Sequence, residues 1–165
     1  NAASQPLKIF TLGLPGNTHT QEGLALLSEY QSGNLTLARL KTLALRVIAV
    51  HSMVKGQGFI NTYNLLKEQY GADSEEAFTI TTRVNRGGGF SKDFLYLNGL
   101  VKILKKYKED SLEALLVGKT SLEFLPILNE LLTRNIIKPP KYIPLSFSMT
   151  PPPHHTREFV LCSLR

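Results

Sequence analysis

The chain has 165 residues, 42% of them hydrophobic and 19% charged, with a formal net charge of +6, which is the composition of a globular domain rather than a disordered segment. Cys162 is the only cysteine, which excludes an intramolecular disulfide and a cysteine-rich zinc cluster and favours a reducing compartment such as the cytoplasm. No apolar run is long enough to span a membrane, and no nucleic-acid-binding motif accompanies the basic residues, so we expect neither partner.

The N-terminal segment begins with an apolar run over residues 7–14, which ends at the turn formers Pro15-Gly16-Asn17. This run predicts a short strand or an ordered loop. Gln21 follows Thr18 by three residues, as in a capping box, and predicts a helix over residues 21–31.

Residues 35–54 give the strongest helical signal, and their apolar side chains leave few polar positions. A helix that is apolar on most sides is typical of a buried central helix. Arg46 interrupts this pattern and must pair with a carboxylate or with backbone carbonyls, because an unpaired buried charge is costly. After Gly56 and Gly58 the periodicity resumes and predicts a helix over residues 59–70.

A second capping box, Asp73 with Glu76, predicts a helix over residues 74–86. Its β-branched centre, residues 79–82, favours a strand by propensity, but the capping signal and the spacing favour the helix. The glycines at 87–89 end this element.

The C-terminal part predicts three more helices. Ser91 is placed to cap one over residues 92–108, a short one follows over 111–117, and Ser121 caps one over 121–134 despite Pro126 near its middle.

The domain organisation follows from this pattern. Pro139-Pro140 ends regular structure, so we expect one folded portion over residues 1–145 and a proline-rich tail over 146–165. The predicted fold class is all-α, with at most one short strand.

The segment Gln21-Glu22-Gly23-Leu24-Ala25 is the most informative for function. Glu22 is expected in the first turn of a helix, where the helix dipole favours a carboxylate, and Gly23 lets another group approach closely. From the residues alone this is a helix-start carboxylate, since one carboxylate does not make a catalytic zinc site, which needs three protein ligands.

The same segment, with Thr20 before it, resembles the signature of the QEGLA-motif proteins, some of which are named flavohaemoglobin expression-modulating proteins. The resemblance covers about residues 5–145 in one order. It is carried by the following further segments: Gln5-Pro6-Leu7-Lys8-Ile9-Phe10, Leu12-Gly13-Leu14-Pro15-Gly16, Leu40-Lys41-Thr42-Leu43-Ala44, Ala77-Phe78-Thr79-Ile80-Thr81, Arg86-Gly87-Gly88-Gly89-Phe90-Ser91-Lys92-Asp93 and Tyr96-Leu97-Asn98-Gly99-Leu100.

That family is similar to the tubulin tyrosine carboxypeptidases, zinc peptidases with a His-Glu-x-x-x-His helix. The resemblance implies that Glu22 is the third zinc ligand and that the chain is the C-terminal helical part of a gluzincin-like metallopeptidase domain. In such a site zinc lowers the pKa of a bound water, and the glutamate between the two histidines takes its proton.

The chain departs from the family at this point, because it contains no His-Glu pair. In the family the missing helix lies just before residue 5, so we expect a C-terminal fragment that is inactive alone and holds no stoichiometric zinc. The missing ligands would come from an N-terminal part of the same protein or from a homodimer partner. Among the histidines, His19 and His51 are interpreted as structural or solvent-facing rather than as zinc ligands, and His154-His155 as irrelevant to the site.

A basic group near the glycine run is the second candidate site. A carboxypeptidase must hold the terminal carboxylate of its substrate, and arginine does so with a bidentate, charge-assisted pair. We expect Arg86 and Lys92, with Arg83 beside them, to bind that carboxylate. The alternative is an ordinary helix end with surface charges.

Two functions therefore stay open. The first is zinc-dependent hydrolysis at the C-terminus of a peptide or protein, and the second is a non-enzymatic regulatory or binding role. A nucleotide-binding loop is excluded, because Glu113 stands where the Walker pattern that ends in Gly118-Lys119-Thr120 requires a glycine.

Overall fold

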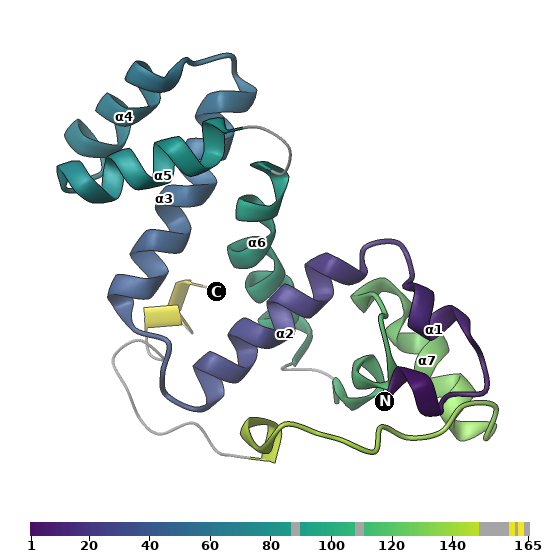
Figure 1. Ribbon diagram of the computed structural model, residues 1–165. Coiled ribbons are helices and arrows are strands. Elements are labelled where there is room, and N and C mark those ends of the chain that lie inside the picture. The colour runs from purple at the N-terminus through teal and green to yellow at the C-terminus, as the bar shows by residue number, and fades with distance from the viewer. Residues whose placement is uncertain (87–89, 108–110, 149–158, 161, 164–165) are drawn as a thin grey trace. The chain divides into compact units, whose positions relative to one another are not determined.

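The computed structural model describes residues 1–86, 90–107, 111–148, 159–160 and 162–163 (Figure 1). Within this part all regular structure is helical, so the prediction of an all-α fold is confirmed. The chain divides into two compact units: a first unit of residues 1–35 with 98–165, and a second unit of residues 36–97. None of the described helices is both long enough and apolar enough to cross a membrane.

The second unit contains three complete helices, α3 (Leu37–Val54), α4 (Phe59–Glu68) and α5 (Ser74–Asn85), and the first part of α6 (Phe90–Tyr107). These bounds agree with the predicted ones to within two residues. The three complete helices pack on one another around a shared apolar cluster. Its fully or almost fully buried members are Leu45, Ala49, Val50, Leu66, Ala72, Ala77, Ile80 and Val84.

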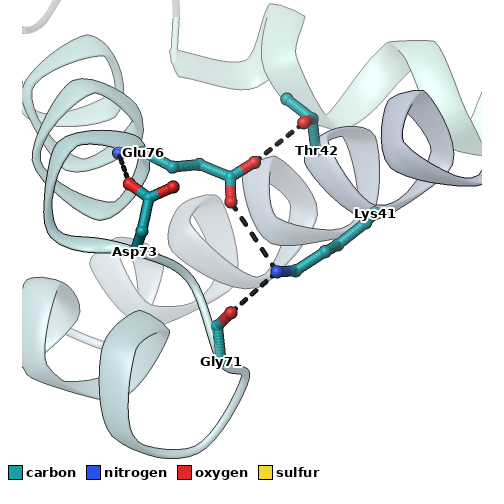
Figure 2. Close-up of polar contacts among 5 residues, drawn as sticks. All are labelled: Lys41, Thr42, Gly71, Asp73 and Glu76. Carbon is teal, nitrogen blue, oxygen red and sulfur yellow. Dashed lines mark hydrogen bonds and ion pairs between the residues drawn. The ribbon is translucent and has the colours of Figure 1, made fainter.

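Polar contacts tie the start of α5 to α3, as Figure 2 shows. The Asp73 side chain accepts a hydrogen bond from the Glu76 N–H at 2.8 Å, which is the predicted cap. The Glu76 carboxylate accepts a hydrogen bond from the Thr42 hydroxyl at 2.8 Å and lies 3.8 Å from the Lys41 ammonium. Lys41 in turn donates to the Gly71 carbonyl. Glu76 therefore holds two helices together.

The β-branched centre of α5 is helical, as the capping signal predicted. Ile80 and Thr81 are buried there, so packing against α3 and α4 overrides their strand propensity.

The first unit contains α2 (Asn17–Gln31), the rest of α6 and a group of short helices. The short helices are the 3₁₀ segments η1 (Ala2–Ser4), η2 (Glu113–Val117), η3 (Leu122–Phe124) and η4 (Leu145–Ser148), and the α-helices α1 (Ile9–Leu12) and α7 (Leu125–Thr133). Its core is rich in leucine, with Leu26, Leu27, Leu35, Leu100, Leu112, Leu115, Leu125 and Leu128 almost completely buried.

Two expectations at the N-terminus are wrong. The apolar run over residues 7–14 forms α1 rather than a strand or loop, and α2 begins at Asn17, four residues before its predicted start. Gly16 precedes α2 with φ of 76°, a left-handed conformation that glycine adopts without strain. The hydroxyl of Thr20, inside the helix, accepts a hydrogen bond from the Leu122 N–H at 2.8 Å. Thr20 thus serves a tertiary contact, and the N-cap residue of α2 is Gly16 rather than the predicted Thr18.

The C-terminal elements also differ in detail from the prediction. Residues 113–117 form a 3₁₀ helix, and α6 begins at Phe90, before the expected cap at Ser91. Pro126 lies in the first turn of α7 and not in its middle. Proline suits that position because the first N–H groups of a helix have no intrahelical acceptor. The boundary of the proline-rich tail stays a prediction, since residues 149–158 lie outside the described part.

Candidate functional site

The motif carboxylate Glu22 lies on α2 and is partly buried. Because α2 starts at Asn17, Glu22 stands in the second turn, and the first turn holds no acidic residue. The expectation that the helix dipole favours Glu22 is therefore wrong, since that effect is confined to the first turn. His19 precedes Glu22 by three residues, so both lie on one face of the helix.

The motif glycine, Gly23, lies where α2 crosses α6. A Cβ on Gly23 would lie 2.7 Å from the backbone carbon and oxygen of Gly99. A Cβ on Gly99 would lie 2.6 Å from the carbonyl oxygen of His19. The close approach expected at Gly23 is thus made by the backbone of another helix. Because Gly23 is next to Glu22, this crossing fixes the orientation of the α2 segment that carries Glu22.

His19 lies beside a small cleft of about 60 Å³, whose lining includes Lys102, Ser121 and Glu123. The cleft has room for a few water molecules but not for a peptide. Burial and the nearby Lys102 ammonium lower the pKa of His19, against smaller opposing effects of Asn98 and Glu123. Within the described residues the His19 Nε2 atom is buried and has no hydrogen-bond partner. Burial therefore favours the neutral form of the His19 imidazole, which packs on α6 beside Gly99.

No group of three His, Cys, Asp or Glu side chains in the described part of the chain is placed to hold a metal ion. Glu22 would therefore need further ligands beyond the described residues to hold a zinc ion. His51 is exposed at the end of α3, and His154 and His155 lie outside the described residues.

Of the predicted carboxylate-binding residues, Arg83 has a partner within the chain. Its Nε donates to the Asp93 carboxylate at 2.6 Å, and the Arg83 side chain stays 35% exposed. A terminal nitrogen of Arg46, on α3, lies 3.9 Å from the same carboxylate oxygen. The expectation that Arg46 pairs with a carboxylate is confirmed. Arg46, Arg83 and Asp93 bring together three helices of the second unit.

Arg86 and Lys92 are both exposed. Arg86 is the C-cap residue of α5, and its N–H donates to the Thr82 carbonyl at 3.1 Å, which fits the alternative of a helix end. The Lys92 ammonium lies 6.0 Å from the centre of the Tyr96 ring. The glycine run at 87–89 lies outside the described residues.

A groove of about 660 Å³ in the second unit was missed by sequence reasoning. Its size falls within the range of small-molecule pockets. No sequence pattern indicated the groove, because its lining residues come from separate helices and loops. It combines apolar Val47, Ile48, Leu65, Tyr70 and Phe94 with polar His51, Ser52, Lys55, Gln57, Asn61, Asn64, Glu68 and Gln69.

The fold and these side chains define the chain as a helical protein in which two partly exposed arginines surround the buried Asp93 and the motif glutamate is partly buried. The family is shown by comparison: the family model described as microtubule-associated tyrosine carboxypeptidase matches residues 1–164. The chain belongs to this family, which confirms the resemblance to relatives of the tubulin tyrosine carboxypeptidases. No curated protein and no solved structure matches the chain.

Proposed function

We propose that this chain is part of a zinc-dependent carboxypeptidase that removes the C-terminal residue, tyrosine or another aromatic, from a peptide or protein. The family match over residues 1–164 carries this proposal. The description of the family supplies the reaction and the tyrosine preference, and the chain supplies a candidate ligand and candidate substrate-binding groups.

Glu22 is the residue we assign to the metal. It is partly buried on a face of α2 that the glycine crossing holds in place, as a ligand needs to be. The two histidines and the general base would come from outside this chain, from an N-terminal part of the same protein or from a homodimer partner.

We assign the substrate carboxylate to the basic residues Arg83, Arg86 and Lys92. Arg83 keeps part of its guanidinium exposed although Asp93 engages its Nε. The groove against α3 and α4 has an apolar part that suits an aromatic side chain, and its polar residues offer hydrogen bonds to a peptide backbone.

A non-enzymatic binding protein is the second candidate. It is favoured by the side chains of Arg83, Arg86 and Lys92, because a basic group needs no metal to bind a carboxylate. The substrate-binding groups would then bind a peptide terminus without cleaving it. For either function we propose a cytoplasmic location, on the ground of the single, exposed, unpaired Cys162.

The test uses the intact protein, expressed together with its upstream coding sequence. Mass spectrometry measures the release of the C-terminal tyrosine from a peptide. The intact protein should release tyrosine, and Glu22→Gln should slow release at least about a hundredfold, because losing a ligand costs more than losing an outer-shell partner. Glu130→Gln, on the exposed face of α7, removes the same charge and should leave the rate unchanged.

Each part of the proposal has its own contrary result. Full activity of Glu22→Gln would remove Glu22 from the metal site. A zinc-loaded intact protein that releases no residue would favour the binding protein instead. For the isolated 165-residue chain we expect less than stoichiometric zinc by metal analysis after dialysis, and one tightly held zinc per chain would contradict this.

A further inference from the structure

Two guanidinium groups in the second unit share one carboxylate. Asp93 is 4% exposed, and a single oxygen of it lies 2.6 Å from Arg83 Nε and 3.9 Å from an Arg46 terminal nitrogen. The shorter contact is a charge-assisted hydrogen bond, whereas the longer one is beyond hydrogen-bond distance. Arg83 therefore holds Asp93, and the three side chains together keep one positive charge in excess.

Arg46 is the member of this group whose hydrogen bonds are incomplete. Its Nε is buried and has no hydrogen-bond partner within the described residues. Its side chain is 19% exposed, so the guanidinium is not sealed in the interior. A guanidinium offers five N–H donors, and the described contact of Arg46 with Asp93, at 3.9 Å, is a charge contact rather than a hydrogen bond.

The surroundings of Arg46 are short of negative charge. Burial, followed by the Arg83 guanidinium, lowers the pKa of Arg46, while Asp93 raises it and Arg39 lowers it further. Arginine nevertheless stays charged at neutral pH. A partly buried cation that lacks a full counter-charge weakens the fold, and a well-packed apolar residue at this position would often be more stable. Stability alone does not account for an arginine here.

We infer that Arg46 is a carboxylate-binding residue, which takes a carboxylate of a bound peptide, from the chain terminus or from an acidic side chain. The ligand completes the charge balance of the Arg46–Asp93–Arg83 centre. Asp93 acts as a positioning residue, because its bond to Arg83 fixes the carboxylate that faces Arg46. The identification of the ligand as a peptide rests on the proposed function. The charge imbalance is observed in the structure and does not depend on that function.

Neither the sequence pattern nor the family match assigns Arg46 to a ligand. Asp93 accepts a described hydrogen bond from Arg83, whereas the described contact of Arg46 with Asp93 is a longer charge contact. Arginine suits this task better than lysine, because its planar fork binds a carboxylate through two parallel hydrogen bonds.

The experiment measures binding of fluorescently labelled short peptides to the 165-residue chain by anisotropy at low salt. Three peptides share a tyrosine at the end: one with a free C-terminal carboxylate, one with a C-terminal amide, and one amidated with a glutamate before the tyrosine. The wild-type chain should bind at least one carboxylate-bearing peptide more tightly than the plain amide. The peptide that binds identifies the source of the carboxylate.

The variants then locate the site. Arg46→Gln should weaken the carboxylate-dependent binding at least tenfold, and Arg46→Lys should weaken it less, because it keeps the charge and loses the fork. Arg134→Gln removes the same charge at the exposed C-cap residue of α7 and should bind like the wild type. Thermal melting checks that each variant is folded, and if Arg46→Gln unfolds, Arg46→Lys carries the test.

Equal binding of all three peptides, no binding of any of them, or unchanged binding by the folded Arg46 variants would overturn the inference. Because binding needs neither zinc nor hydrolysis, this result is independent of the tyrosine-release assay. An inactive intact protein whose chain still binds carboxylates through Arg46 would refute the peptidase and leave the binding residue standing.

Discussion

The crossing of α2 with α6 and the Arg46–Asp93–Arg83 centre differ in how closely their atoms are packed and in how fully their polar groups are paired. At the crossing the backbones of Gly23 and Gly99 leave no room for even one added carbon. At the arginine centre one carboxylate faces two cations, and a buried nitrogen has no partner within the described residues. The crossing holds its face of α2 rigidly, whereas the arginine centre keeps unused binding capacity. Gly23 and Gly99 therefore serve to position a site, whereas Arg46 is a residue able to bind a ligand.

The largest effect should follow from filling the crossing. Gly23→Ala would place a Cβ 2.7 Å from backbone atoms of Gly99, which cannot move aside as a flexible side chain could. We expect the free energy of unfolding to fall by about 3 kcal/mol, the upper part of the usual range for overpacking. Urea unfolding followed by circular dichroism measures it.

Gly58→Ala is the matched control for this change. Gly58 has an ordinary φ of −73°, and no atom lies within 4 Å of the position that a Cβ would take there. The alanine should therefore cost well under about 1 kcal/mol, the scale of an N-cap change. If Gly23→Ala and Gly58→Ala lower the free energy of unfolding by similar amounts, the crossing is not tightly packed and Gly23 does not position the site.

A smaller effect should distinguish the two arginines by stability. Arg83→Gln removes the 2.6 Å bond and leaves the buried Asp93 with only the 3.9 Å contact, so we expect a loss of about 2 kcal/mol. Arg46→Gln leaves the Arg83 bond intact and should cost less than about 1 kcal/mol. Thermal or urea unfolding of both variants gives the difference. A larger loss for Arg46→Gln would make Arg46 the structural member and reverse the assignment.

The second unit was the more predictable because its signals are local. The Asp73 side chain caps α5 through the N–H three residues on, and such a contact needs no knowledge of the rest of the fold. The first unit was less predictable because its polar groups act over long separations in sequence. Thr20 binds the N–H of Leu122, and Gln5 binds the backbone of Lys138, so neither residue reveals its role in its own neighbourhood.

The candidate site divides in the same way. Arg46 visibly required a partner because it interrupts an apolar helix, but Asp93 could not be named from the sequence, since their meeting depends on how α3 and α6 pack. The glycine in the motif predicted a close approach without revealing that Gly99 makes it. Whether Glu22 binds a metal stays a prediction.

The smallest effect concerns the pH response of the α2–α6 crossing. Burial and Lys102 lower the pKa of His19, so the folded chain favours the neutral imidazole more than the unfolded chain does. Below the ordinary histidine pKa of about 6.5 the unfolded state takes up a proton that the folded state resists, and the free energy of unfolding falls. Glu123 faces His19 and reduces this effect without reversing it.

We therefore expect the wild-type chain to lose more stability between about pH 7.5 and about pH 5.5 than His19→Gln does, measured by urea unfolding at both pH values. His51→Gln, which removes an exposed histidine at the end of α3, is the control and should respond to pH like the wild type. Equal pH responses in all three chains would show that His19 is protonated as readily in the folded as in the unfolded chain. In that case the His19 Nε2 atom would have to be accessible to water. The crossing of α2 with α6 would then no longer differ from the partly exposed arginine centre in its exclusion of solvent.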